Sequence, residues 1–216
     1  MKHMQTDKYT IAWFKIADYV SRGEKERALG VYRLLSHSFN DDAVARQLEA
    51  DIYFSCNEQE RAIILYRQAM ELYQKSKRFM EAAAICEHLL LLLPHDASLR
   101  REIILCYNNI KLASKIYVHA QRFVEMYARE NKWQDIEHFI HDHDSVLEPL
   151  ARLALYQPII IATNNVAGHT DLAHMCIQKT VTGLLCEEYE CALQEFFAAL
   201  RAVNEDLHKY ALDCLK

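Results

Sequence analysis

Glycine and proline are scarce in this sequence, with four glycines and three prolines among 216 residues. Sheets and β-hairpins depend on turn residues of these kinds, so their scarcity favours long helices joined by short links. Uninterrupted apolar runs of about 20 residues, which a membrane-spanning helix needs, are also missing. Residues 88–94 (HLLLLLP) hold five leucines before the proline, and the uncharged stretch 153–170 is interrupted by polar residues, a proline and a glycine. We therefore expect no membrane insertion.

Strong net charge and paired cysteines are absent as well. The formal net charge of −5 gives no electrostatic reason to expect nucleic acid or an anionic membrane as a partner. The seven cysteines are odd in number and contain no C-x-x-C pair, which disfavours both a disulfide framework and a zinc site. The first twenty residues lack the uninterrupted apolar core of a secretory signal. These absences predict a cytoplasmic protein with free thiols and without a metal or another cofactor.

Catalytic sequence motifs are missing too. The chain has no glycine-rich phosphate loop, no G-x-S-x-G and no H-E-x-x-H. The densest basic stretch, residues 73–79 (YQKSKRF), is short for the basic stripe with aromatic platforms that an RNA-binding helical repeat needs. We therefore expect a protein that is not an enzyme, with RNA binding as an alternative hypothesis.

A short apolar signature recurs along the chain: an alanine, an aromatic or medium-sized apolar residue four positions later, and a small or apolar residue three further on. Offsets of four and seven place all three side chains on one face of a helix. The alanine permits close approach of two helices, and the larger side chain fills the gap one turn later. The five copies are Ala28-Tyr32-Leu35, Ala62-Tyr66-Ala69, Ala82-Cys86-Leu89, Ala113-Tyr117-Ala120 and Ala192-Phe196-Ala199.

Further positions recur around the copies that begin at Ala28 and Ala62. The first copy is preceded by Trp13, Ile16, Ala17, Val20 and Gly23. The second is preceded by Ala50 and Tyr53, with Asn57 at the position that corresponds to Gly23. The third copy lies between Phe79 and Pro94, and the last is preceded by Tyr189. In these positions, and in the distance between the first two copies, the chain resembles the tetratricopeptide repeat family, whose unit is a pair of antiparallel helices. The resemblance is good over 9–94, weak over 96–142 and partial over 170–203, and 145–169 departs from it. The spacing is irregular, because the interval from Ala62 to Ala82 is much shorter than the interval from Ala28 to Ala62.

The resemblance implies an all-α fold, a right-handed array of antiparallel helix pairs (an α-solenoid). Residues 1–144 would form the repeats, and residues 145–216 would continue or cap the array. The helical periodicity predicts twelve helices: 9–22, 25–38, 42–56, 59–76, 79–93, 96–109, 112–130, 133–142, 146–165, 171–186, 189–202 and 204–215. N-cap residues are predicted at Asn57 and Ser145, each with a glutamate three positions later, and at Asp96 and Thr170 alone.

The resemblance also implies a binding groove lined by the first helix of each pair. Its positions correspond to Phe14, Asp18, Ser21 and Arg22 in the first unit, and to Val44, Gln47, Asp51, Phe54 and Ser55 in the second. The family's clamp of Lys, Asn and Arg for the C-terminal carboxylate of chaperones is replaced here by acidic and amide residues, so that ligand is not expected. A mildly acidic groove with two phenylalanines suits a basic or apolar peptide, and a solvated face without a ligand is the alternative.

Two apolar segments need an explanation. The helix predicted over 79–93 has more apolar side chains than a one-sided amphipathic helix requires, and the surplus ones are Ile85, Leu91 and Leu92. This surplus indicates either a helix sandwiched between neighbours or an exposed patch for a partner. In the segment 153–165, Pro158 interrupts a helical pattern. It either bends or breaks one buried helix, which could shape a cavity, or ends one helix and starts another.

Residues 138–144 (HFIHDHD) gather three histidines and two aspartates. We interpret them as the end of a helix, with His143 and Asp144 beyond it and Ser145 starting the next helix. The alternative is a metal-dependent hydrolase of the HD type, in which His141 and Asp142 would converge with a distant histidine and aspartate. His119, His169 and His174 are the histidines that such a site could recruit.

Taken together, the sequence predicts a scaffold, adaptor or chaperone-like assembly factor that binds another protein or a peptide. It leaves the identity of the partner and the oligomeric state open.

Overall fold

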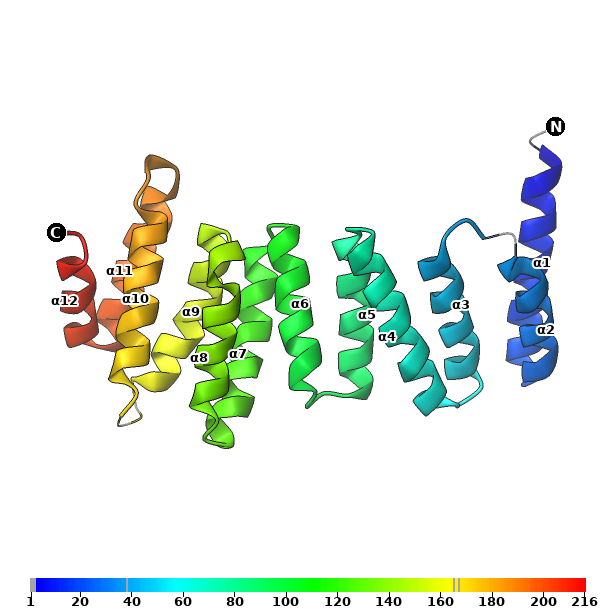
Figure 1. Ribbon diagram of the computed structural model, residues 1–216, viewed down its shortest axis with the longest axis horizontal. Coiled ribbons are helices and arrows are strands. Elements are labelled where there is room, and N and C mark those ends of the chain that lie inside the picture. Colours follow the sequence, from blue (N-terminus) through cyan, green and yellow to red (C-terminus); the bar gives the residue numbers. More distant parts are fainter. Residues whose placement is uncertain (1–2, 38, 165, 167) are drawn as a thin grey trace. The chain divides into compact units, whose positions relative to one another are not determined.

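The computed structural model describes residues 3–37, 39–164, 166 and 168–216, and this part of the chain is helical with no strand (Figure 1). It contains twelve α-helices and two 3-10 turns, which confirms the all-α class and the predicted number of helices. The helices are α1 (His3–Ser21), α2 (Lys25–Ser36), α3 (Asp42–Ser55), α4 (Gln59–Lys75), α5 (Phe79–Leu92), α6 (Ala97–Asn109), α7 (Ala113–Arg129), α8 (Trp133–His143), α9 (Pro149–Thr163), α10 (Thr170–Leu184), α11 (Glu190–Val203) and α12 (Glu205–Asp213), with the 3-10 turns η1 (Asp144–Val146) and η2 (Glu187–Tyr189).

Two helix starts differ clearly from the prediction. Helix α1 begins at His3 rather than at residue 9, because a helix can extend into a polar segment that carries no apolar periodicity. The helix expected over 146–165 begins at Pro149, after a separate 3-10 turn. Proline is favoured in the first turn of a helix, where its missing N–H would have no intrahelical partner.

The N-cap predictions are right at one of four positions. The carboxylate of Asp96 accepts a hydrogen bond from the backbone N–H of Leu99 at 3.0 Å, as expected. Asn57, Ser145 and Thr170 are not N-caps, because the residues that precede helices α4, α9 and α10 are Glu58, Glu148 and His169, none of which makes a side-chain cap bond.

The chain divides into two compact units, Met1–Leu92 and Leu93–Lys216. In the first unit each helix packs against the next, from α1 to α5. In the second, α7 contacts α6, α8 and α9, while α10 packs against α9 and against the terminal pair α11 and α12. The boundary considered from the sequence, at residues 144 and 145, falls inside the second unit, in the 3-10 turn after α8.

Five helix ends in these units share one geometry. Each has a residue with positive φ just after the helix, at Gly23, Asn57, Lys77, Lys111 and Asn131, with φ between 55° and 71°. The N–H of the following residue donates to the carbonyl of a tyrosine four residues before the positive-φ position, at 2.8–3.0 Å. This is the Schellman arrangement, which satisfies carbonyls at a helix end and reverses the chain. The tyrosines are Tyr19, Tyr53, Tyr73, Tyr107 and Tyr127.

The spacing of these turns accounts for the irregular repeat. A long step along the chain, from Gly23 to Asn57, is followed by a short one to Lys77, and the same long and short steps then lead to Lys111 and Asn131. Helices α4 and α7, each 17 residues long, have such a turn at both ends, so each belongs to two successive helical hairpins. The arrangement of turns therefore repeats every three helices, with two such turns in each repeat, rather than one turn for every two helices.

Candidate functional site

The groove positions predicted on α1 lie at its surface. Phe14 is 71% exposed, and Asp18, Ser21 and Arg22 are also exposed. The polar groups contact one another: Arg22 forms an ion pair with Asp18 at 2.8 Å, and Ser21 Oγ donates to the Asp18 carbonyl at 2.8 Å. The α1 positions thus form an exposed surface whose charges are already paired along the helix.

The groove positions predicted on α3 are used in packing against α4. Tyr73 donates its hydroxyl hydrogen to Gln47 Oε1 at 2.7 Å, and Tyr66 donates to Asp51 Oδ1 at 2.6 Å. Burial of the tyrosine ring and the hydrogen bond to the carboxylate both raise the pKa of Tyr66. Partial desolvation raises the pKa of Asp51, in opposition to the hydrogen bond from Tyr66. Val44 is half-buried and Ser55 is exposed on the same helix.

An aromatic cluster continues this surface onto α5. The rings of Phe54, Tyr66 and His88 meet edge to face, with centroids 4.8–6.4 Å apart. The Nε2 atom of His88 is buried and has no hydrogen-bond partner in the part of the chain that the structure describes. Sequence reasoning missed His88, which lies at the start of the leucine run and carries no signal of its own. The structure therefore brings Gln47, Asp51 and Phe54 together with α4 and α5, and describes no hydrogen bond, ion pair or ring contact from them to the predicted α1 positions.

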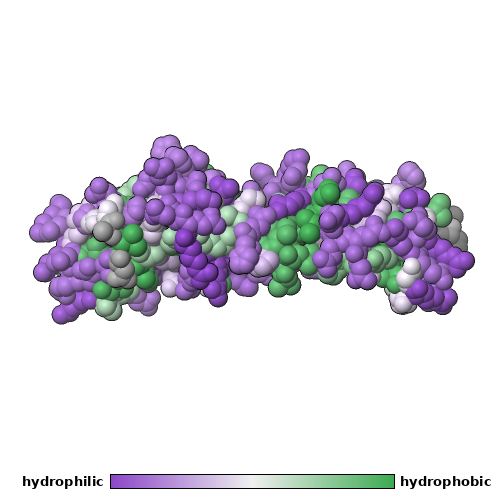
Figure 2. All heavy atoms as spheres, turned by 90° about the horizontal axis from the view of Figure 1, so that it is seen from below, coloured by the Kyte–Doolittle hydropathy of each residue, from purple (hydrophilic) through white to green (hydrophobic). Residues whose placement is uncertain are grey.

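The apolar patch proposed on α5 is not a single surface. Ile85 is only 4% exposed and belongs to the core, so its assignment to a patch is wrong. Leu91 is exposed and Leu92 is half-buried. Other large apolar side chains are exposed elsewhere, and the face drawn in Figure 2 shows separate apolar areas, a broad one of them right of the centre, with hydrophilic side chains between them.

The histidine-rich segment lies at the end of α8. The helix continues through His143, so the expectation that His143 lies beyond its end is wrong; the ring packs on Phe139 and its Nδ1 is 2.9 Å from the Phe139 carbonyl. His138 is exposed, as are His141 and Asp142, which lie 3.3 Å apart. His119 and His174 stack on tyrosine rings, and His169 packs at a tilt against the Trp133 ring. Within the described residues, no three His, Cys, Asp or Glu side chains are grouped so as to hold a metal ion.

Asp144, the last residue of that segment, is the centre of a half-buried polar cluster. Its Oδ1 accepts hydrogen bonds from Arg152 Nε at 2.9 Å and from the Tyr156 hydroxyl at 2.5 Å, and its Oδ2 accepts one from Lys179 Nζ at 2.6 Å. Arg152 Nη2 also donates to the Asp144 carbonyl at 3.0 Å. The cluster joins the 3-10 turn η1 to helices α9 and α10.

The electrostatics of the cluster hold Asp144 in its charged form. Burial raises the pKa of this carboxyl group, but the hydrogen bonds from Lys179 and Tyr156 and the charge of Arg152 outweigh burial, so the pKa lies below its usual value. The pKa of Tyr156 is raised by burial and by the neighbouring carboxylate. Three side chains of the chain itself donate to the Asp144 carboxylate, two of them cations, which is the arrangement of a structural ion pair.

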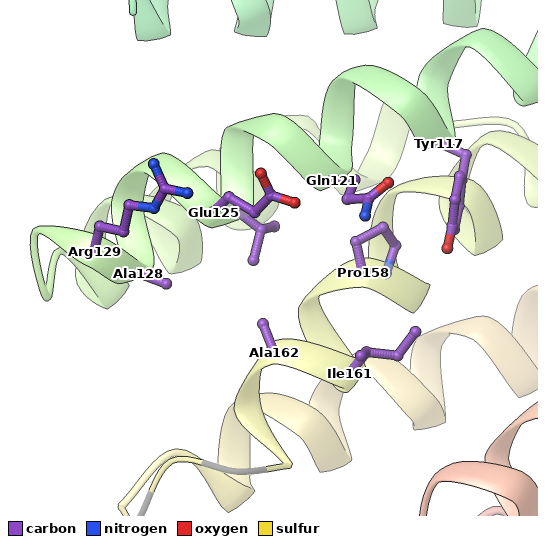
Figure 3. A pocket seen from close by; sticks show the side chains of 9 residues that line it. Tyr117, Gln121, Glu125, Ala128, Arg129, Pro158, Ile161 and Ala162 are labelled. Atoms are coloured by element: carbon purple, nitrogen blue, oxygen red, sulfur yellow. The ribbon is translucent and has the colours of Figure 1, made fainter.

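A pocket of about 330 Å³ opens between α7 and α9. Figure 3 shows Pro158 of α9 facing Gln121 of α7, with Ile161 and Ala162 further along α9. Helix α9 continues through Pro158, which rules out the reading that a new helix starts there. We call this site the α7–α9 pocket. Its lining residues are Tyr117, Gln121, Val124, Glu125, Ala128, Arg129, Pro158, Ile161 and Ala162.

Comparison with known proteins adds no family to this description: no protein-family model matches the chain, and no curated protein matches it. Among the described residues, no helix is both long enough and apolar enough to cross a membrane.

Proposed function

We propose that this protein is a non-catalytic scaffold or assembly factor that binds another protein. The observation that carries the proposal is the repeated helical hairpin: five turns of one geometry connect helices that pack on their neighbours and leave a face at the surface. Stacked helical repeats typically offer extended surfaces to partner chains rather than a single reaction centre.

The polar side chains with distinctive surroundings support the same proposal. The carboxylates of Asp51 and Asp144 accept hydrogen bonds from tyrosines of neighbouring helices, and Asp144 is also paired with two cations. These groups stabilise helix packing. The α7–α9 pocket, in contrast, has a largely apolar wall that is open at the surface, which is typical of a surface that binds a partner.

The test is affinity capture of the full chain from its native cells, after brief chemical crosslinking. We expect a protein that is recovered reproducibly and near stoichiometrically, and that forms the same complex when both purified proteins are mixed. If no protein is recovered reproducibly, the proposal is wrong, and a reaction catalysed by the purified chain alone would also contradict it.

A further inference from the structure

The α7–α9 pocket has an apolar floor with room for a bulky side chain. Val124 and Pro158 are buried, Ala128 and Ala162 are half-buried, and Ile161 is 39% exposed. The small alanine side chains, one on each helix, leave the space between the two backbones open. A volume of about 330 Å³ lies at the lower end of the range for ligand pockets, which suits one large side chain and its flanking backbone.

One end of the pocket carries an uncompensated positive charge. Arg129, the last residue of α7, is exposed and has no ion-pair partner among the described residues. Glu125, the acidic residue in the lining, forms an ion pair with Arg122 at 2.9 Å, so its negative charge is balanced by that cation. Two cations of the helices that form the walls are already paired, Arg122 with Glu125 and Arg152 with Asp144. Arg129 is the cation in the pocket lining, and its charge favours a negatively charged group at this end of the pocket.

The other end of the pocket is polar but neutral. Tyr117 and Gln121 lie one and two turns from the N-terminus of α7 and provide a hydroxyl and an amide beside the apolar floor. Such groups donate and accept hydrogen bonds, which a peptide backbone needs when it crosses a groove. An apolar centre with hydrogen-bonding groups at one end and a cation at the other defines an orientation for an extended or helical segment.

We infer that the α7–α9 pocket binds a segment of a partner protein that presents a bulky apolar side chain and, beside it, an Asp or Glu. The apolar side chain occupies the floor formed by Ala128, Pro158 and Ile161, and the carboxylate pairs with Arg129. This inference rests on the proposed function and specifies where, and through which chemistry, the partner binds.

The experiment uses a library of random 16-residue peptides displayed on phage and selected against the full chain. We expect the enriched peptides to share a Leu, Met, Phe or Trp with an acidic residue within one helical turn. The affinity of a synthetic enriched peptide, measured by fluorescence anisotropy, should fall about tenfold for Ile161→Ser, because part of the buried apolar area is lost. For Arg129→Gln it should fall by up to about fivefold, the range of an exposed ion pair.

Two variants on the same helix serve as matched controls. Val118→Ser removes an apolar side chain that is 54% exposed but does not line the pocket, and Lys115→Gln removes an exposed cation outside the lining. Both should bind the peptide as the unmodified chain does. Because Arg129 and Ile161 are exposed, the variants should keep the helical circular dichroism of the parent.

The outcomes separate the pocket from the general proposal. Enriched peptides that are basic, an empty selection, or affinities unchanged in both pocket variants would overturn the pocket assignment. If a partner captured from cells binds Arg129→Gln and Ile161→Ser as well as it binds the parent, the scaffold function stands and the pocket is not its site. If no partner is captured at all, the scaffold function itself fails.

Discussion

At the scale of single residues, Asp144 shows how context changes the meaning of a motif. In the sequence it is the last of five potential metal ligands within seven residues. In the fold its carboxylate accepts hydrogen bonds from Arg152, Tyr156 and Lys179, while His141 and Asp142 of the same segment are exposed to solvent. Two of its three partners come from α9 and one from α10, up to 35 residues away in the chain. No local pattern could have revealed this convergence.

Replacing this carboxylate should weaken the second unit. Asp144→Asn leaves Arg152 and Lys179 without their counter-charge in a half-buried site, so we expect the free energy of unfolding to fall by about 2–3 kcal/mol at pH 7. Asp142→Asn, two residues earlier and exposed, should change it by less than about 0.5 kcal/mol. Urea unfolding followed by circular dichroism measures both. Equal effects of the two substitutions would contradict the structural role of Asp144.

The same carboxylate should give the stability of the protein a defined pH dependence. Its pKa in the folded chain lies below the usual value of 3.8, so its contribution is fully present above that value and is lost as the pH falls through the folded pKa. The stability difference between the parent and Asp144→Asn should therefore be constant from neutral pH down to about 5 and shrink below about pH 4. A difference that shrinks between pH 8 and pH 6 would point to another group.

At the scale of elements, helices were predictable and their junctions were not. The apolar periodicity placed ten of the twelve helix starts within one residue of their positions in the structure, because each helix has a buried face. The repeat signature failed at Ala113-Tyr117-Ala120, whose first two side chains are only half-buried. The buried face of α7 is instead Ile116, Ala120 and Phe123, three residues later in register.

A better marker of the hairpins combines the turn with the helix after it. Five residues beyond each positive-φ position stands a fully buried alanine or isoleucine: Ala28, Ala62, Ala82, Ile116 and Ile136. With the tyrosine four residues before the turn, this makes a ten-residue pattern that the sequence contains five times. It could not be recognised from glycines, because Asn or Lys occupies the positive-φ position in four of the five copies.

Two glycines test the role of these turns. At Gly23 a Cβ would meet no neighbour, but φ is +71°, so Gly23→Ala should cost about 1–2 kcal/mol through backbone strain alone. Gly30 lies inside α2, also without a neighbour near its Cβ, so Gly30→Ala should raise stability by about 0.5–1 kcal/mol. Urea denaturation of both variants should show shifts of opposite sign. Shifts of the same sign would mean that the turn does not constrain the helix end.

The lysines at equivalent turns offer the reverse change. Lys77 has φ of +58°, which a residue with a side chain adopts at a cost, so Lys77→Gly should stabilise the first unit by about 0.5–1 kcal/mol. Lys75→Gly, at the last position of α4, provides the control and should destabilise it, because glycine weakens a helix. A higher thermal midpoint for the first variant and a lower one for the second is the expected result.

At the scale of the whole molecule, the division into two compact units departs from the reading of the sequence, which considered a boundary at residues 144 and 145. That boundary was placed where the family resemblance stops and the polar junction begins. In the structure, α7 and α9 pack against each other across that junction, and Asp144 joins η1 to α9 and α10. Long-range packing of this kind leaves no trace in composition or spacing, which is why the sequence could not locate the division after Leu92.

The two boundaries can be distinguished by dissection of the chain. A fragment of residues 93–216 keeps all helices of the second unit and its fully buried side chains, among them Phe123, Ile136 and Tyr156. We expect it to fold alone, with cooperative thermal unfolding and dispersed amide resonances. Helix α9 packs mainly against α7 and α10. A fragment of residues 145–216 keeps α10 but lacks α7, so it should remain largely unfolded. If both fragments fold, residues 145–216 are an independent unit and a boundary lies at residues 144 and 145. If neither folds, the second unit is not independent.

If only 93–216 folds, its affinity for the selected peptides should equal that of the full chain, because every residue that lines the α7–α9 pocket lies within it.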